Sequence, residues 1–368
     1  MTFTCTKENL SRGLTNVAQI AGRNKQLPAL EHVHLHLANG VLKLTTTDLE
    51  VGARATVPGK VEQEGSCVTP ARPLMEYVQQ LPATQPITLS LGKKGLAVST
   101  AGFEAQFPVG TEEDFPLLPQ VSGGTVVTLA APLFCQALSR ALFSAARDDT
   151  RPEIHSVYLS ASADTITAAA TDSFRLAEER LGRDEQGEAF TLLLPLSTAQ
   201  EIVRLFADAD TVRLTPQESH IEVASNGLEL TSRLVDGTYP NYQHIIPQSF
   251  SATGTVEREV FIRALKTLLV FLPRDTRRVE LSVHPQQGTL TVRVGGGEAG
   301  AGDVEVPFSG EGEELTMLFN INYLLDGLQH LPGEQAVLKF VGNSEPAMFL
   351  PEGEAAQYTY VVMPIQQT

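Results

Sequence analysis

Three stretches of this chain, roughly 125 residues apart, repeat one helical pattern that constrains the fold more than any other feature. In each stretch, two apolar residues stand four positions apart and a third follows, as on one side of a helix. The three sets are Leu10, Leu14 and Val17; Phe134, Leu138 and Leu142; and Phe261, Leu265 and Leu269. The period is too long for a solenoid and close to the length of a domain, so the sequence predicts three tandem copies of one fold. A chain of like units favours a closed, symmetric assembly.

The length of the chain agrees with this interpretation. A chain of 368 residues is expected to form two or three domains at about 150 residues each, and the repeat selects three. Glycine and serine gather at residues 121–125 and 249–254, and similar segments, Asp114–Pro116 and Thr238–Tyr242, precede these two sites. The predicted domains are residues 1–122, 123–252 and 253–368.

Each third shows the same order of signals: a helix, strands with alternating apolar residues, a second helix midway, and closing strands. The second helices are predicted at residues 73–81, 197–206 and 321–331. The strands are predicted at residues 31–37, 41–45, 95–99, 157–160, 166–170, 220–223, 279–283, 290–294 and 358–363. Two helices against many strands, without regular βαβ order, predict an α+β domain with antiparallel sheets.

The sequence suggests an intracellular location. No apolar run is long enough to cross a membrane, and the first residues lack the basic start and apolar core of a signal peptide, so we expect a cytoplasmic protein. Cys5, Cys67 and Cys135 are an odd number without CxxC spacing, which favours reduced thiols over a disulfide framework or a zinc site.

The formal charge of −16 argues at first against a nucleic-acid partner. The negative charge is concentrated in the last two thirds of the chain. Residues 1–122 carry 10 basic and 11 acidic groups, residues 123–252 carry 9 basic and 17 acidic groups, and residues 253–368 carry 8 basic and 15 acidic groups. An acidic protein can still hold a basic inner surface while its outside repels DNA.

Sequence motifs for catalysis are absent. The chain holds no GxSxG, HExxH or Walker motif, and the glycine-rich Gly295–Gly302 is predicted to be a mobile hairpin tip rather than a phosphate cradle. His32, His34 and His36 have a spacing that could hold a metal on one face of a strand. We favour a plain strand, because the intervening residues 33, 35 and 37 would form its buried face. We therefore expect no enzyme, metal or cofactor.

Several short segments, in order along the whole chain, resemble the bacterial DNA sliding clamps, the beta subunits of DNA polymerase III. The segments are residues 3–6, 27–30, 47–50, 171–176, 234–242, 319–326 and 360–364. The resemblance implies a homodimer, joined head to tail, whose six like domains form a ring around duplex DNA with helices lining the hole. It also implies a non-catalytic, nucleoid-associated processivity factor that slides without sequence specificity, holds the replicative polymerase and other replication or repair proteins, and needs an ATP-dependent clamp loader.

By charge and by analogy with this family, the dimer seam is expected to join the first third of one copy to the last third of another. The residues expected there are Lys93, Lys94, Phe107, Val270, Phe271, Glu298, Asp303 and Glu305. A solvated acidic hairpin is the alternative interpretation of the three acidic positions.

The resemblance also implies that basic groups face the DNA. The candidates are Arg12, Arg23, Lys25, Arg72, Arg140, Arg147, Arg151, Arg204, Arg263, Lys266, Arg274 and Arg277. Loop groups recur at corresponding places in the three repeats, at residues 23–25, 147–151 and 274–277. Family members often carry a basic pair at the start of the middle domain's second helix, where this chain has Leu196 and Ser197.

The family binds short linear peptides of its partners in an apolar cleft between the middle and last domains. Carried over by position, the cleft comprises Ile154, Thr171, Phe174, Arg175, Leu176, Pro240, Ile245, Asn320, Tyr323, Val362, Met363, Pro364 and Ile365. Arg175 and Asn320 are expected to fix the peptide backbone or an acidic end. Phe174 stands where a histidine is usual, and the tail ends in Gln366–Thr368 where a basic or apolar residue is common.

Two functions other than a sliding clamp are compatible with the sequence. The first is a monomeric peptide-binding adaptor that is indifferent to DNA, and the second is a hydrolase whose catalytic residues are hidden in the sequence. Oligomeric state and retention on circular DNA separate the first from a clamp, and a deep pocket with pKa-shifted acids would reveal the second.

Overall fold

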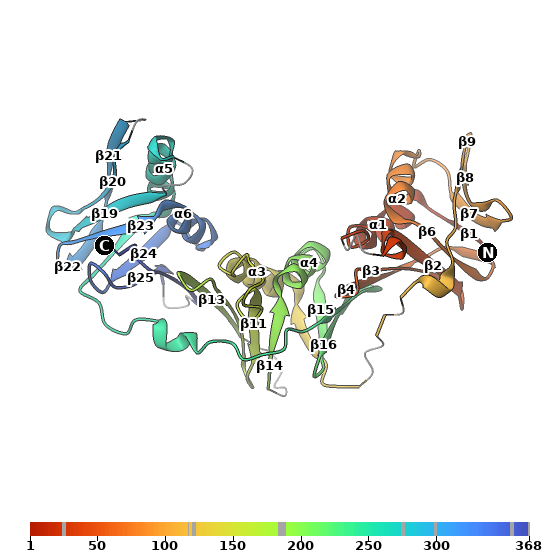
Figure 1. The fold of residues 1–368 in the computed structure, drawn as a ribbon, viewed down its shortest axis with the longest axis horizontal. Coiled ribbons are helices and arrows are strands. Elements are labelled where there is room, and N and C mark those ends of the chain that lie inside the picture. The colour runs from red at the N-terminus through yellow and green to blue at the C-terminus, as the bar shows by residue number, and fades with distance from the viewer. Residues whose placement is uncertain are drawn as a thin grey trace. The chain divides into compact units, whose positions relative to one another are not determined.

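The computed structural model describes residues 1–23, 27–116, 118–119, 123–182, 189–273, 277–297, 300–353 and 357–366. The chain forms two compact units. Unit 1 comprises Met1–Pro132 and Arg204–Leu234, and unit 2 comprises Leu133–Val203 and Val235–Thr368. The middle third of the sequence therefore contributes to both units (Figure 1).

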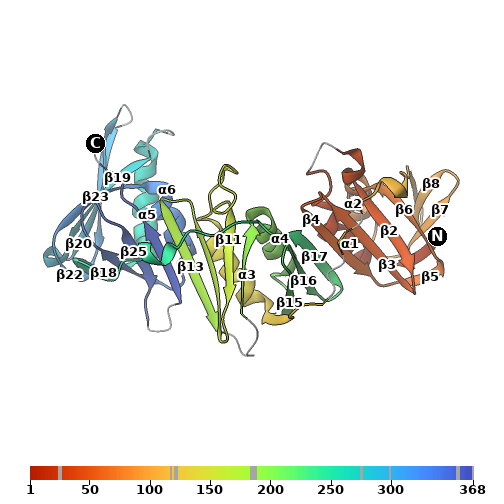
Figure 2. The same ribbon diagram turned by 60° about the horizontal axis from the view of Figure 1, so that its bottom comes forward.

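Unit 1 holds two antiparallel sheets in its described part, ordered β5-β1-β7-β8-β9 and β10-β15-β16-β17-β4-β3-β2-β6. Strand β4 of the first third lies beside β17 of the middle third (Figure 2). The strands are β1 (Thr2–Cys5), β2 (His32–Ala38), β3 (Val41–Thr47), β4 (Val51–Val57), β5 (Lys60–Gln63), β6 (Gly65–Pro70), β7 (Ile87–Gly92), β8 (Gly95–Thr100), β9 (Phe103–Phe107), β10 (Val127–Ala130), β15 (Thr211–Pro216), β16 (His220–Ser225) and β17 (Leu228–Arg233).

Unit 2 holds two further antiparallel sheets, ordered β14-β11-β12-β13-β26-β25-β24-β18-β22 and β21-β20-β19-β23 among its described residues. In the first sheet, β13 of the middle third pairs with β26 near the carboxyl end. The strands are β11 (Ser156–Ala161), β12 (Thr165–Thr171), β13 (Arg175–Gly182), β14 (Phe190–Pro195), β18 (Ala252–Glu257), β19 (Arg278–His284), β20 (Thr289–Gly297), β21 (Gly300–Pro307), β22 (Ser309–Gly312), β23 (Leu315–Asn320), β24 (Gln335–Phe340), β25 (Ala347–Pro351) and β26 (Tyr358–Val362).

Helices occur in pairs, one pair in each third of the chain. They are α1 (Lys7–Ala18) and α2 (Ala71–Gln80), α3 (Ala131–Leu142) and α4 (Leu196–Phe206), and α5 (Arg258–Leu268) and α6 (Ile321–His330). Helix α1 packs against α2, and α5 packs against α6. The Thr6 hydroxyl caps α1 by accepting the backbone N–H of Asn9 at 3.3 Å. Helices and antiparallel sheets in this order confirm the predicted α+β class.

The third apolar residue predicted for the buried side of the repeated first helix is buried in only one copy. Val17, seven residues after Leu10, is fully buried. In the other two copies the buried residues are Ala141 and Leu268, again seven positions after the first apolar residue, whereas Leu142 and Leu269 are half-buried. A separation of seven residues is two helical turns, so it returns closer to the buried face than a separation of eight.

Strand β2 has the alternation expected for it. Its residues 33, 35 and 37 are buried, whereas His32 and His34 are half-buried and His36 is exposed. No group of His, Cys, Asp and Glu that could hold a metal occurs among the described residues. The glycine-rich segment Gly295–Gly302 lies in the β20–β21 hairpin, although residues 298–299 fall outside the described part. None of the described helices is long and apolar enough to span a membrane.

Candidate functional site

The turn between β12 and β13 carries the residues at the centre of the predicted partner-peptide cleft. The Thr171 hydroxyl donates to the carbonyl of Arg175 at 2.6 Å. One Asp172 carboxylate oxygen accepts the backbone N–H groups of Phe174 and Arg175 at 2.9 and 3.0 Å. Ser173 adopts a left-handed conformation with φ of 77°. The turn is therefore closed by its own side chains, and it leaves Phe174 61% exposed.

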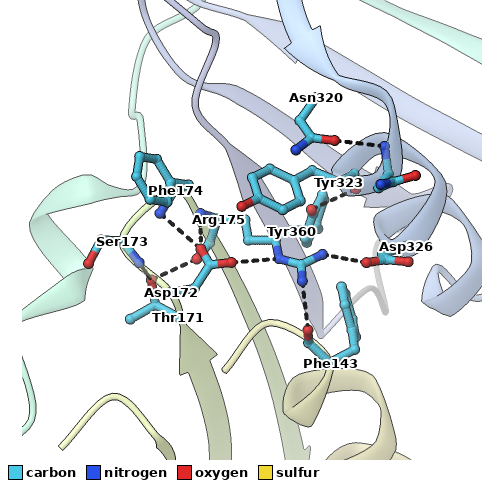
Figure 3. Close-up of polar contacts among 11 residues, drawn as sticks. Phe143, Thr171, Asp172, Ser173, Phe174, Arg175, Asn320, Tyr323, Asp326 and Tyr360 are labelled. Atoms are coloured by element: carbon cyan, nitrogen blue, oxygen red, sulfur yellow. Dashed lines mark hydrogen bonds and ion pairs between the residues drawn. The ribbon is translucent and has the colours of Figure 1, made fainter. Parts of the chain in front are cut away.

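Arg175 lies inside unit 2, with only 4% of its side chain exposed. Its Nε donates to Asp172 Oδ2 at 3.0 Å and its Nη1 to Asp326 Oδ2 at 2.6 Å (Figure 3). Its Nη2 donates to the Phe143 carbonyl at 3.0 Å, and its guanidinium lies 4.4 Å from the centre of the Tyr323 ring. This residue therefore joins the turn to α6 and to Phe143, which directly follows α3.

Asn320 is also engaged within the chain. Its side-chain oxygen accepts the backbone N–H of Asn322 at 3.0 Å and so caps α6. The family resemblance predicts that Arg175 and Asn320 contact a bound peptide, but their main partners belong to unit 2 itself. We therefore assign them a positioning role, because they hold the turn and α6 beneath the exposed residues.

The tail after β26 runs alongside the same turn. Arg175 pairs with Val362 across the β13–β26 ladder, and the N–H of Met363 donates to the Phe174 carbonyl at 2.8 Å. Ile365 N–H donates to the carbonyl of Leu318 at 2.6 Å. The sequence predicted that the turn and the tail belong to one site, and unit 2 brings these segments together.

The predicted cleft residues differ in exposure. Ile154, Thr171, Arg175, Leu176, Val362 and Pro364 are buried; Asn320, Tyr323, Met363 and Ile365 are half-buried; and Phe174, Pro240 and Ile245 are exposed. The exposed and half-buried apolar members could contact a peptide, and the buried ones form the support beneath them.

Most of the predicted DNA-facing groups lie at the surface. Arg12, Arg23, Arg72, Arg147, Arg151, Arg263 and Lys266 are exposed, and Arg204 and Arg277 are half-buried. Lys25 and Arg274 lie outside the described residues. Arg140 is different, because its Nη1 forms an ion pair with Glu179 Oε1 at 2.9 Å and little of either side chain is exposed. Burial raises the pKa of Glu179, and the nearby charge of Arg140 opposes that rise. Because the ion pair directs Arg140 to Glu179 within unit 2, we remove Arg140 from the DNA-facing set.

The residues predicted at the dimer seam are distributed unevenly between surface and core. Lys93, Lys94, Val270, Asp303 and Glu305 are exposed, and Glu298 lies outside the described residues. Phe107, however, is buried and packs edge-on against Tyr77 at 5.6 Å between ring centres. Phe271 is half-buried against the core of unit 2.

Phe103, which is not among the residues predicted for the dimer seam, is 50% exposed on strand β9. No sequence signal distinguishes Phe103 from Phe107, because residues four positions apart lie on the same face of a strand and only the structure shows that Phe107 is covered. Phe103 and Val270 are therefore among the large apolar side chains that the described part of the chain exposes to solvent.

Comparison with known proteins finds one family along nearly the whole chain. The N-terminal, central and C-terminal domain families of the DNA polymerase III beta subunit match residues 1–119, 128–241 and 243–366. The beta sliding clamp of Synechococcus elongatus is 28% identical over 100% of this chain and 99% of that protein, and that of Pseudomonas putida is 28% identical with complete coverage of both. The crystal structure of DNA polymerase III subunit beta from Pseudomonas aeruginosa superposes with a TM-score of 0.93 at 26% identity, covering both chains completely. With three domains of the sliding-clamp fold, the chain belongs to the DNA polymerase III beta subunit family, the beta sliding clamps of DNA replication.

Proposed function

We propose that two copies of the chain close head to tail into a ring that encircles duplex DNA and tethers the replicative polymerase. The observation that carries this proposal is the tandem match to all three clamp domains, each with its own helix pair. A head-to-tail contact that repeats with the right rotation closes on itself, and two chains of three domains would close at six. The ring would hold DNA by enclosure, as a non-catalytic processivity factor loaded by a separate ATP-dependent loader.

Two free strand edges support a seam between copies. In the described part of the chain, β9 is bonded only to β8 and β21 only to β20. Pairing β9 of one copy with β21 of another would satisfy both edges and cover Phe103 and Val270. Lys93 and Lys94, in the turn before β8, would then complement the exposed acids Asp303 and Glu305 on β21.

The exposed arginines and lysines of the DNA-facing set would contact phosphates. Such contacts carry no base sequence information and weaken steeply with salt, which suits a ring that must slide. Enclosure then supplies the retention that weak contacts do not.

The exposed apolar residues of unit 2 would hold the partner peptides. Phe174, Pro240, Ile245 and the half-buried Met363 offer apolar contacts, and methionine adapts to ligands of different shape. Arg175 would keep the turn in place without touching the peptide.

Retention on DNA of different topology tests the ring. The protein is loaded on nicked circular plasmid with a bacterial clamp loader and ATP, and bound protein is separated by gel filtration. We expect retention on the circle, release after the plasmid is cut once, and retention again when both ends of the cut plasmid are blocked with streptavidin. Equal retention on circular and open linear DNA would show binding by adhesion and contradict the ring.

A separate experiment tests the tether. Phe174→Asp with Ile245→Asp changes two exposed side chains, so the fold and retention on circular DNA should persist while stimulation of the polymerase is lost. Deletion of Met363–Thr368 should also abolish stimulation and leave the dimer intact. Full stimulation by both variants would place the partner site elsewhere.

A further inference from the structure

The turn Thr47–Val51 of unit 1 repeats the hydrogen bonds of the Thr171–Arg175 turn in unit 2. The Thr47 hydroxyl donates to the Val51 carbonyl at 3.0 Å, and one Asp48 carboxylate oxygen accepts the N–H groups of residues 50 and 51 at 3.0 and 2.8 Å. Leu49 has the same left-handed conformation as its counterpart, with φ of 81°. The local scaffold of the partner-peptide cleft is thus built twice in one chain.

The neighbouring strand is repeated as well. Val51 pairs with Ser232 of β17, as Arg175 pairs with Val362 of β26. The N–H of Arg233 donates to the carbonyl of Glu50 at 3.0 Å, which is the counterpart of the bond from Met363 to the turn in unit 2. Strand β17 and the residue after it therefore stand where β26 and the tail stand in unit 2.

A cavity of about 240 Å³ lies at this second turn. Its lining includes Leu49, Val51, Pro116, Ser232 and Arg233. The last four correspond to Arg175, Pro240, Val362 and Met363, which are residues predicted for the partner-peptide cleft. The cavity is thus at the equivalent position, inside unit 1.

The residue at the base of this cavity differs from its counterpart in unit 2. Gly52 replaces the buried Leu176, and the Leu118 side chain lies over it so closely that a methyl group on Gly52 would overlap it. Leu118 belongs to the segment after β9, so unit 1 supplies an apolar floor from this segment and leaves the cavity beside it open.

The rim of the cavity differs in charge. Exposed Glu50 and Arg233 stand where unit 2 has Phe174 and Met363, and Leu49 at the rim is 42% exposed. A ligand that fits this rim needs an apolar side chain for the cavity, a basic group near Glu50 and an acidic group near Arg233. We propose that unit 1 carries a second peptide site, which takes a short linear peptide with apolar residues flanked by one basic and one acidic residue. The peptide class rests on the function proposed for unit 2.

Methyl NMR spectroscopy of the full-length protein tests the site. The probe is acetyl-Lys-Leu-Leu-Glu-amide, added to protein labelled at its leucine, valine and isoleucine methyl groups. We expect saturable shifts at Leu49, Val51 and Leu118 and no such shifts with acetyl-Lys-Ser-Ser-Glu-amide. Leu49→Asp should weaken probe binding by about tenfold or more. That variant should fold, because aspartate tolerates a left-handed backbone better than leucine. The matched variant Ser173→Asp, at the equivalent position of unit 2, should leave these shifts unchanged.

The location of the shifts separates this proposal from the one for unit 2. Shifts confined to Val362 and Ile365, no saturable shift at millimolar probe, or equal shifts with the serine peptide would overturn the second site. If the probe shifts the methyl signals of unit 1 while polymerase peptides do not bind to unit 2, the second site is upheld. The tether proposed for unit 2 is then rejected.

Discussion

At the scale of single residues, the buried Arg175 of unit 2 is held by two carboxylates. Arg175 is covered on all sides, and its charge is matched by Asp172 and Asp326 rather than by solvent. Burial alone would lower the pKa of Arg175, but Tyr360 and the two carboxylates raise it above its usual range, so the guanidinium stays charged. A buried ion pair of this kind specifies an arrangement and becomes costly when one partner is removed.

Replacing Arg175 by methionine tests this role. We expect Arg175→Met to lower the free energy of local opening around β13 by about 3 kcal/mol, because it leaves Asp172 partly buried without a counter-charge. Hydrogen exchange of the β13 amides measures the change. The matched variant Arg293→Met breaks a more exposed pair with Glu280, and it should cost under about 1 kcal/mol in β20. Equal costs would mean that Arg175 does not hold the turn.

The protonation of His34 gives unit 1 a dependence on pH. Burial lowers the pKa of His34 below its ordinary value of 6.5; Glu112 opposes the shift, and His36 and Arg54 add to it. The unfolded chain therefore binds this proton more readily than the folded chain. Above pH 6.5 His34 is neutral in both states and does not lower the free energy of unfolding of unit 1. As the pH falls below 6.5, the unfolded chain gains the proton first, so the free energy of unfolding decreases.

We expect His34→Gln to reduce the loss of stability between about pH 6.5 and pH 5. Urea unfolding followed by circular dichroism at a series of pH values measures it. At about pH 8 the wild-type residue is neutral in both states, so any difference there reports the lost packing against Phe115, whose ring centre lies 5.5 Å away. An unchanged pH dependence in the variant would exclude His34 as its source.

At the scale of elements, the first helix of each third buries the same positions. In α1, α3 and α5 the first, fifth and eighth residues of the pattern are buried. The fifth is leucine in all three helices, the first is leucine or phenylalanine, and the eighth is valine, alanine or leucine. Helix α5 ends at Leu268, and Leu269 begins a short 3₁₀ turn, which explains why the stripe stops one residue earlier than expected. The helical period and the helix end together set the register.

A pair of adjacent substitutions tests this register. Leu268→Ala should lower the free energy of local opening of α5 by about 2–5 kcal/mol, because it leaves a cavity in the core of unit 2. Leu269→Ala should cost only about 1 kcal/mol, since that side chain is half-buried. Hydrogen exchange of the α5 amides compares the two. A larger cost at Leu269 would reverse the assignment of the buried face.

At the scale of the whole molecule, the three thirds of the sequence are joined through their sheets. Strand β17 of the middle third continues a sheet of the first, and β13 of the middle third continues a sheet that includes β26. The predicted domain boundaries, residues 122/123 and 252/253, stay predictions, because hydrogen bonding runs across the thirds. The free edges of β9 and β21 are where the proposed assembly would continue.

Oligomeric state tests the proposed seam. Phe103→Glu with Val270→Asp places charges on two exposed apolar positions, so we expect folded monomers in sedimentation velocity that are not retained on closed circular DNA. These positions are better suited than Phe107 and Phe271, because a charge at either of those would disturb the core. Val126→Glu changes another exposed apolar residue and should leave a dimer. A dimer from the double variant would remove this seam.

The sequence by itself determined the tandem repeat, the α+β class, the helix pairs and nine of the strands, because these depend on apolar periodicity within short segments. It also placed the turn before β13 and the tail after β26 in one site through the family resemblance. Only the tertiary structure decided that Arg175 and Arg140 are committed to internal ion pairs and that Phe107 is covered. It alone revealed that Leu118 lines a cavity at the turn Thr47–Val51 of unit 1. The reason is physical: whether a charge or ring meets solvent depends on side chains that are distant in sequence, and no local pattern records them.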